Sequence, residues 1–231
     1  MRTIHLFLIL ISFVFCPFNA FSYHVLNDIS GNRVQFNHWN KLPVTFRIDG
    51  GTLDGGDGVP LFLDACDEWN KIQGLANICG SWTQIDEDIT SSNFNDITSL
   101  SDGIVDIVFD ETGEILTSLG LPATVLGVGI TSINSSGIIT DGILVLNGSR
   151  PSSTTADILA TAVHELGHIW GLAHTPVGAI ITTNNSSNFG LDPMQPSAIP
   201  TMFPFTNPEN DEFGRTLEPD DIAVMKILYP E

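Results

Sequence analysis

The chain has 231 residues, of which 27 are acidic and 8 are basic, so its formal net charge is −19. Such an excess of negative charge repels nucleic-acid phosphates and anionic membrane surfaces, and we expect neither as a partner. Hydrophobic residues make up 42% of the chain, which is enough for a folded core and excludes global disorder.

Residues 1–22 have the features of a secretory signal. Arg2 supplies a positive start, an apolar run follows over residues 4–15, and Ala20 and Ser22 give a small-residue cleavage site, so we expect cleavage after Ser22. The alternative is an uncleaved membrane anchor, but the run is short for a bilayer. We therefore expect an exported, soluble protein. Its mature part, residues 23–231, is predicted to be a single domain and a monomer.

Apolar residues alternate with polar ones over residues 42–49, which predicts a strand. A glycine-rich loop follows, and Pro60 then opens a predicted helix. Its apolar residues recur every three or four positions and define a core face: Leu61, Ala65, Trp69 and Ile72. Further strands are predicted over residues 102–110, 125–131 and 142–147.

The segment 155–170 gives the strongest helix prediction. Its apolar positions fall on one side of a helix: Ile158, Leu159, Ala162, Val163 and Leu166. Gly171 then ends the helix, because glycine adopts backbone conformations that other residues resist. A last helix is predicted to begin near Pro219, with Asp220 and Asp221 in its first turn.

Loss of the signal leaves two cysteines, Cys66 and Cys79. An oxidising compartment allows them to form a disulfide, which is the favoured interpretation because exported proteins seldom keep reactive thiols. The alternative is a pair of buried free thiols.

Three residues inside the predicted helix 155–170 form the pattern H-E-x-x-H: His164, Glu165 and His168. Histidines four positions apart project from one helix face, at a separation that one zinc ion bridges. His174 adds a third nitrogen if Gly171 turns the chain back. Three imidazoles leave one zinc position for water, as in catalytic sites. The alternative is an amphipathic helix with exposed histidines.

Residues 164–174 (HELGHIWGLAH) resemble the signature of the metzincin metallopeptidases, and the chain looks most like the matrixin branch. The resemblance implies an α+β fold with a twisted mixed sheet and three main helices. It also implies a secreted zinc endopeptidase that cleaves protein or peptide substrates. In that family a zinc-activated water attacks the peptide bond, and the resemblance makes Glu165 its general base.

The resemblance also assigns supporting parts. Metzincins place a methionine turn beneath the metal, and residues 200–204 match it, so Met202 is the predicted methionine, with Met194 a weaker candidate. The acidic pair at the start of the last helix is implied to brace the active-site helix. Ile143, Leu144 and Val145 resemble the edge strand that pairs with an extended substrate, although an ordinary buried strand is an equal alternative.

Calcium is a possible second metal, since acidic residues gather in two places. The first is the loop that contains Asp54 and Asp57, and the second consists of Asp106, Asp110 and Glu111. Neither has the spacing of a known calcium loop, and solvated turns are the favoured interpretation.

The alternative function is a secreted zinc-binding surface or adhesion protein that keeps the fold without catalysis. Glu165 separates the two functions, because an inactive relative often loses this carboxylate and the present chain retains it.

Overall fold

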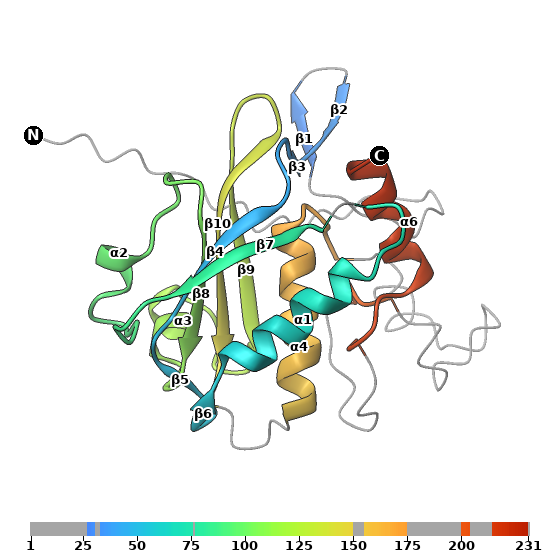
Figure 1. Cartoon of the computed structure of the whole chain (residues 1–231). Helices are drawn as coiled ribbons and strands as arrows, with labels where there is room; N and C mark the ends of the chain where they lie inside the picture. The colour runs from blue at the N-terminus through green and yellow to red at the C-terminus, as the bar shows by residue number, and fades with distance from the viewer. Residues whose placement is uncertain are drawn as a thin grey trace, which may run out of the picture.

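A six-stranded sheet forms the centre of the computed structural model, which describes residues 27–30, 33–75, 77–149, 155–174, 200–203 and 214–230. The main path of the sheet runs β3 (His38–Trp39), β10 (Ile138–Asn147), β8 (Val105–Asp110), β4 (Val44–Ile48) and β7 (Cys79–Gln84). Neighbours on this path are parallel. The remaining strand, β9 (Gly127–Ile133), pairs antiparallel with β10 and lies at an edge (Figure 1).

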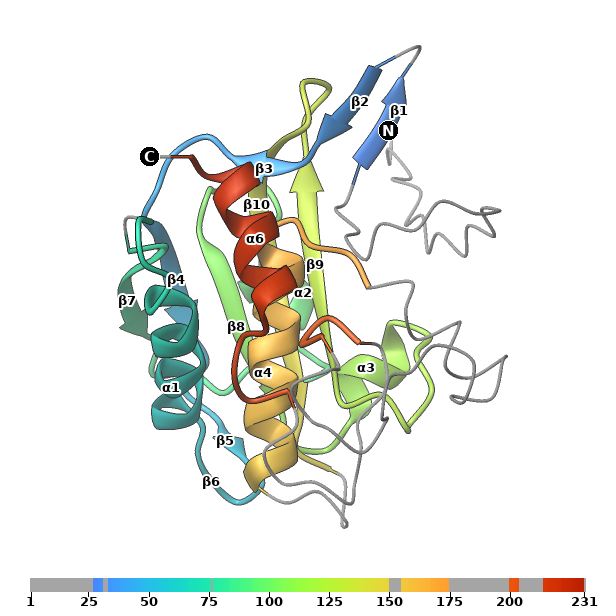
Figure 2. The same ribbon diagram turned by 90° about the vertical axis from the view of Figure 1, so that its right-hand side faces the viewer.

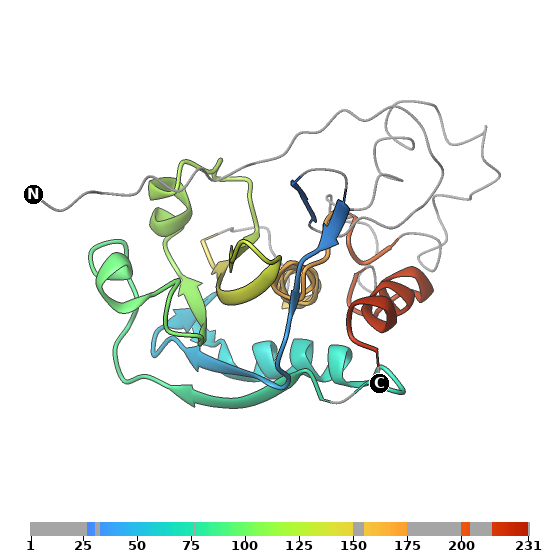
Figure 3. The ribbon, with the colours of Figure 1, turned by 90° about the horizontal axis from the view of Figure 1, so that it is seen from above.

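Apolar side chains are buried on both faces of this sheet. One face carries α1 (Val59–Asn70) and α4 (Thr155–Ile169), and α2 (Phe94–Ile97) and α3 (Glu114–Ser118) lie on the other side (Figure 3). Successive residues of β8 divide between the two cores, with Ile107 and Phe109 in the first and Val108 in the second. Such two-sided burial is typical of central parallel strands, whose crossover connections place helices on the faces.

The last helix, α6 (Pro219–Leu228), lies beside α4 on the side of the molecule seen in Figure 2. Its residues Val224, Met225 and Leu228 are buried. Just after it, the Tyr229 hydroxyl donates a hydrogen bond of 2.7 Å to the carbonyl of Trp170. The C-terminal segment is therefore tied directly to the end of α4.

Two small hairpins complete the described structure. The first joins β1 (Asn27–Ser30) to β2 (Arg33–Phe36), and the second joins β5 (Thr52–Leu53) to β6 (Gly56–Asp57). No helix in the described ranges is both long and apolar enough to cross a membrane. The predicted signal, residues 1–22, lies outside these ranges.

The prediction of a mixed fold of helices and strands is confirmed, and α1, α4 and α6 are the three longest helices among the residues described. The predicted strand 125–131 is observed two residues later, as β9, and the strand predicted over 142–147 begins earlier, at Ile138. The sequence did not predict β7, in which only Cys79 is buried and residues 81–84 are exposed. An edge strand of this kind lacks the apolar alternation that reveals most strands.

The predicted disulfide between Cys66 and Cys79 is wrong for this structure, where both residues are buried free thiols. They are nevertheless neighbours, on α1 and β7. Burial, followed by the adjacent Cys66, raises the pKa of the Cys79 thiol well above its usual value. Because the thiolate is the species that is oxidised to a disulfide, a buried thiol with a raised pKa is slow to react.

Candidate metal centre

The three predicted metal ligands lie at the C-terminal end of α4 and just beyond it. His164 and His168 are one helical turn apart, and α4 ends at Ile169. Gly171 then turns the chain with a φ of 95°, and a Cβ at this position would lie 2.2 Å from the carbonyl oxygen of Asn37. Only glycine satisfies both conditions, so Gly171 is what returns His174 to the helix face.

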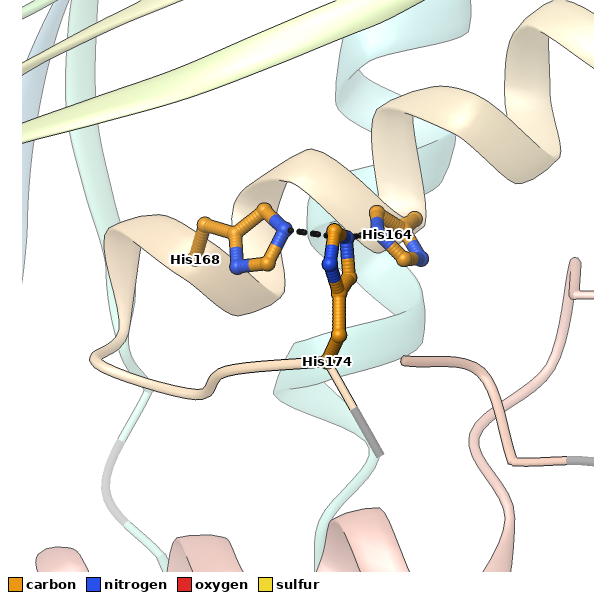
Figure 4. A group of neighbouring side chains, drawn as sticks. All are labelled: His164, His168 and His174. Atoms are coloured by element: carbon orange, nitrogen blue, oxygen red, sulfur yellow. Dashed lines mark hydrogen bonds between the residues drawn. The ribbon is translucent and has the colours of Figure 1, made fainter. Parts of the chain in front are cut away.

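The Nε2 atoms of the three histidines converge (Figure 4). The Nε2 atom of His174 lies 3.2 Å from that of His168 and 3.1 Å from that of His164. A zinc ion with Zn–N bonds of about 2.0–2.1 Å at tetrahedral angles holds its nitrogen ligands about 3.3–3.4 Å apart. The observed separations are close to this spacing.

Backbone carbonyls determine which nitrogen of each ring faces the centre. The Nδ1 atom of His164 lies 2.8 Å from the carbonyl oxygen of Thr201, and that of His168 lies 2.8 Å from the carbonyl oxygen of Leu172. A carbonyl oxygen only accepts, so Nδ1 carries the proton in both rings. In these two neutral rings Nε2 therefore carries a lone pair and no proton. Of the three converging Nε2 atoms, only that of His174 can carry a proton. The arrangement fits a cation held by Nε2 atoms.

The electrostatic environment keeps these rings neutral. Burial lowers the pKa of His164 well below its usual value, and the neighbouring His168 and His174 lower it further. Burial also lowers the pKa of His168. Burial of the ring, followed by His168, lowers the pKa of the more exposed His174 to about 4. Metal ligation needs neutral imidazole, so the site is prepared to bind an ion below neutral pH.

A titration of the metal-free protein checks this property. We expect the ring-proton NMR signals of His164 and His174 to keep their neutral shifts between pH 7.5 and 5.5, whereas an imidazole with a pKa near 6.5 would be about 90% protonated at pH 5.5. The midpoint of His168 should lie below 6.5. Because the unfolded chain takes up these protons below about pH 6.5 and the folded chain does not, the free energy of unfolding should fall as the pH drops from that value. Midpoints near 6.5 for all three rings would contradict the expectation.

Glu165 lies beside the histidines but is not one of the groups that share the metal position. It is buried, and its Oε2 accepts a hydrogen bond of 2.7 Å from the backbone N–H of Gly129 on β9. Burial raises the pKa of Glu165 to about 7, and the Gly129 bond opposes that rise. A carboxyl that exchanges its proton near neutral pH is suited to general acid–base chemistry.

The turn that contains Met202 lies directly under α4. The N–H of Phe203 donates to the carbonyl of Pro200 over 3.0 Å, and Met202 is buried. A Cβ added at Gly167, between the two helical ligands, would lie 2.2 Å from the Met202 sulfur. The sequence prediction for Met202 thus falls on a residue packed against the site, while Met194 lies outside the described residues.

Asp221 supports this turn. The sequence predicted only that the acidic pair at the start of the last helix braces α4. One carboxylate oxygen of Asp221 accepts the N–H of Thr201 at 3.1 Å and that of Glu218 at 3.0 Å. Burial raises the pKa of Asp221, and the bonds from Thr201, Glu218 and Met202 oppose that rise. Since the carbonyl of Thr201 contacts His164, a chain of contacts runs from α6 to the metal position.

The edge-strand prediction for Ile143, Leu144 and Val145 is wrong. These residues belong to β10, which pairs with β8 on one side and with β9 on the other. Their backbone groups are used within the sheet, which leaves none for a substrate. The strand at the edge beside α4 is β9.

The second group of acidic residues considered for calcium makes contacts within the protein. Asp106 is buried and binds the Arg47 guanidinium, with distances of 2.7 and 2.9 Å. Asp110 accepts the N–H of Leu116, and Glu111 accepts that of Gly55. Across the residues that the structure describes, His164, His168 and His174 form the one group of three or more ligand side chains close enough to hold a metal ion.

Comparisons with known proteins do not add to this picture. No model of a known protein family matches the chain, and no curated protein matches it significantly.

Proposed function

We propose that this protein is a secreted zinc endopeptidase with a metzincin-type, matrixin-like catalytic domain. The observation that carries the proposal is the convergence of three Nε2 atoms beside a buried carboxyl with a pKa of about 7. Three nitrogen ligands are typical of catalytic rather than structural zinc sites. The secretory location rests on the composition of residues 1–22.

Each residue of the site has a proposed role. His164, His168 and His174 would hold the ion, which when bound supplies a Lewis acid that polarises a carbonyl and lowers the pKa of water to about 7. Glu165 does not compete for the ion, so its carboxylate stays available as the base that accepts a proton and later donates it to the leaving amine. Met202, Thr201 and Asp221 keep the first ligand in place from below.

Strand β9 is the proposed binding edge for substrate, in place of residues 143–145. It pairs with the sheet through β10 alone, so every second backbone group along it points away from the sheet. An extended peptide adds to such an edge through main-chain hydrogen bonds. Since β9 also contacts α4, a peptide bound there would pass next to the histidines.

The test is a peptidase assay on the mature chain with a library of unstructured peptides. We expect one zinc ion per chain, cleavage that a chelator abolishes, and recovery when zinc is restored. The alternative, a zinc-binding secreted protein without catalysis, predicts the same stoichiometry with no cleavage. A chain that binds zinc and cuts nothing in the library would reject the enzyme in favour of that alternative.

A further inference from the structure

We propose that the segment Gly127-Val128-Gly129 of β9 is a positioning element for the general base, and that the backbone N–H of Gly129 holds the Glu165 carboxylate in its working orientation. The inference rests on the proposed function and deepens it, because it assigns the orientation of the base to the strand rather than to the helix that carries it.

The register of the sheet explains why this N–H is available. The N–H of Asn147 donates to the carbonyl of Leu126, and Leu144 stands opposite Gly129. In an antiparallel ladder, hydrogen-bonded and non-hydrogen-bonded pairs alternate, so Gly129 falls on a non-bonded pair whose N–H points away from β10. That N–H is directed to Oε2 of Glu165 at 2.7 Å.

The two glycines explain how the strand comes so close to α4. A Cβ at Gly129 would lie 2.7 Å from the backbone oxygen of Glu165 and 2.9 Å from the Cβ of His168. A Cβ at Gly127 would lie 2.8 Å from the methyl carbon of Thr161 and 3.0 Å from Cγ of Glu165. Any other residue at either position would therefore push the strand and the helix apart and lengthen the bond.

No second described residue duplicates the bond from Gly129. Within the part of the chain that the structure describes, it is the one hydrogen bond to the Glu165 side chain. A buried carboxylate is stabilised by each hydrogen-bond donor that contacts it. Without its donor, the Glu165 side chain loses the contact that favours one rotamer over the others. A displacement of the base by about 1 Å lowers the reaction rate by as much as about 100-fold.

The direct test removes this N–H and adds no atom. The Gly129 amide is replaced by an ester in the full mature chain. The matched control is the same replacement at Gln84 of the edge strand β7, at the other end of the sheet, whose N–H points away from β4 because Ile85 is the donor to Ile48. We expect the Gly129 ester to lower kcat about 10- to 100-fold, with KM within about twofold and one zinc bound. The Gln84 ester should keep the wild-type kcat. An unchanged kcat in the Gly129 ester, or an effect on KM alone, would overturn the proposal.

Conventional mutagenesis gives a second variant. Gly129→Ala should lower kcat through the clash with the α4 backbone, whereas a Cβ at Gly56 would lie no closer than 3.8 Å to its nearest neighbour, the carbonyl oxygen of Leu53, so Gly56→Ala should leave kcat close to wild type. In a Glu165→Ala background the Gly129 substitution should have no further effect on kcat, because both changes act on one interaction. Additive losses would argue against a role that operates through Glu165.

Amide hydrogen exchange tests the contact without any assay of activity. In the metal-free protein, Glu165→Ala should speed exchange of the Gly129 amide at least about tenfold and leave that of Thr131 unchanged. Equal Gly129 exchange in both proteins would overturn the proposal. A zinc-bound wild type that cleaves no peptide would instead reject the proposed function and the catalytic role of the contact with it. An active wild type whose Gly129 ester keeps full kcat would reject the positioning role alone.

Discussion

Replacing Glu165 by glutamine is expected to lower kcat about 10²- to 10⁴-fold while one zinc ion stays bound, which is the usual contribution of a general base. Glutamine has nearly the same size and keeps an oxygen that accepts the Gly129 N–H, so the site should keep its shape. What it loses is the capacity to take up a proton. The measurement is peptide hydrolysis with zinc content determined on the same samples.

Stability serves as the control for this variant. Because burial raises the pKa of Glu165 to about 7, the folded state resists ionisation of this carboxyl. A buried acid of this kind costs stability as the pH rises from its unfolded value near 4.5 to about 7, and the amide avoids that cost. Metal-free Glu165→Gln should therefore be at least as stable as the wild type at pH 8. Full hydrolytic activity in the variant would exclude Glu165 as the base.

The second large effect is expected from Asp221→Asn, which should lower the free energy of unfolding by about 2–3 kcal/mol. The substitution replaces one of the two carboxylate oxygens by an NH₂ group that cannot accept, so the N–H groups of Thr201, Glu218 and Met202 lose part of their acceptor. The displaced turn also moves the carbonyl that contacts His164. Loss of such an outer partner typically lowers metal affinity about 10- to 100-fold, so zinc should bind more weakly.

Asp220→Asn is the matched control, since it changes the same charge one residue away. Burial, followed by the charge of Asp221, raises the pKa of Asp220 to about 6, so its ionised form is disfavoured. Removing that charge should leave the stability unchanged or increase it at neutral pH. The measurements are denaturant unfolding and zinc titration of both variants. Equal losses of stability and of zinc affinity in the two variants would contradict a specific role for Asp221.

The metal centre is the part of the molecule that the sequence predicted best. Two ligands and the base share one helix whose apolar periodicity is strong, and a glycine marks the turn that returns His174. These are local signals, contained in about twenty residues. The support from Asp221 to Thr201 joins residues 20 positions apart, and its hydrogen bonds leave no trace in periodicity.

The edge of the sheet was beyond sequence reasoning for a related reason. Residues 143–145 form an apolar run, which is typical of a strand covered on both faces, and of the two equal alternatives, an edge strand and a buried strand, the structure has the buried one. The true edge, β9, carries glycines whose purpose is the close approach to α4. The two cysteines give a similar lesson, because the expected compartment favoured a disulfide and the sequence did not reveal the buried environment that keeps them as thiols.

The path from Asp221 through Thr201 to His164 also has a consequence for the order of assembly. His164, the first of the proposed zinc ligands, donates its outer hydrogen bond to the carbonyl of residue 201, and that residue is held by residue 221. A chain whose last helix has not yet docked lacks this support, even where α4 has formed. Full affinity for the proposed zinc ion is thus expected only of the finished fold, in which the last helix has docked.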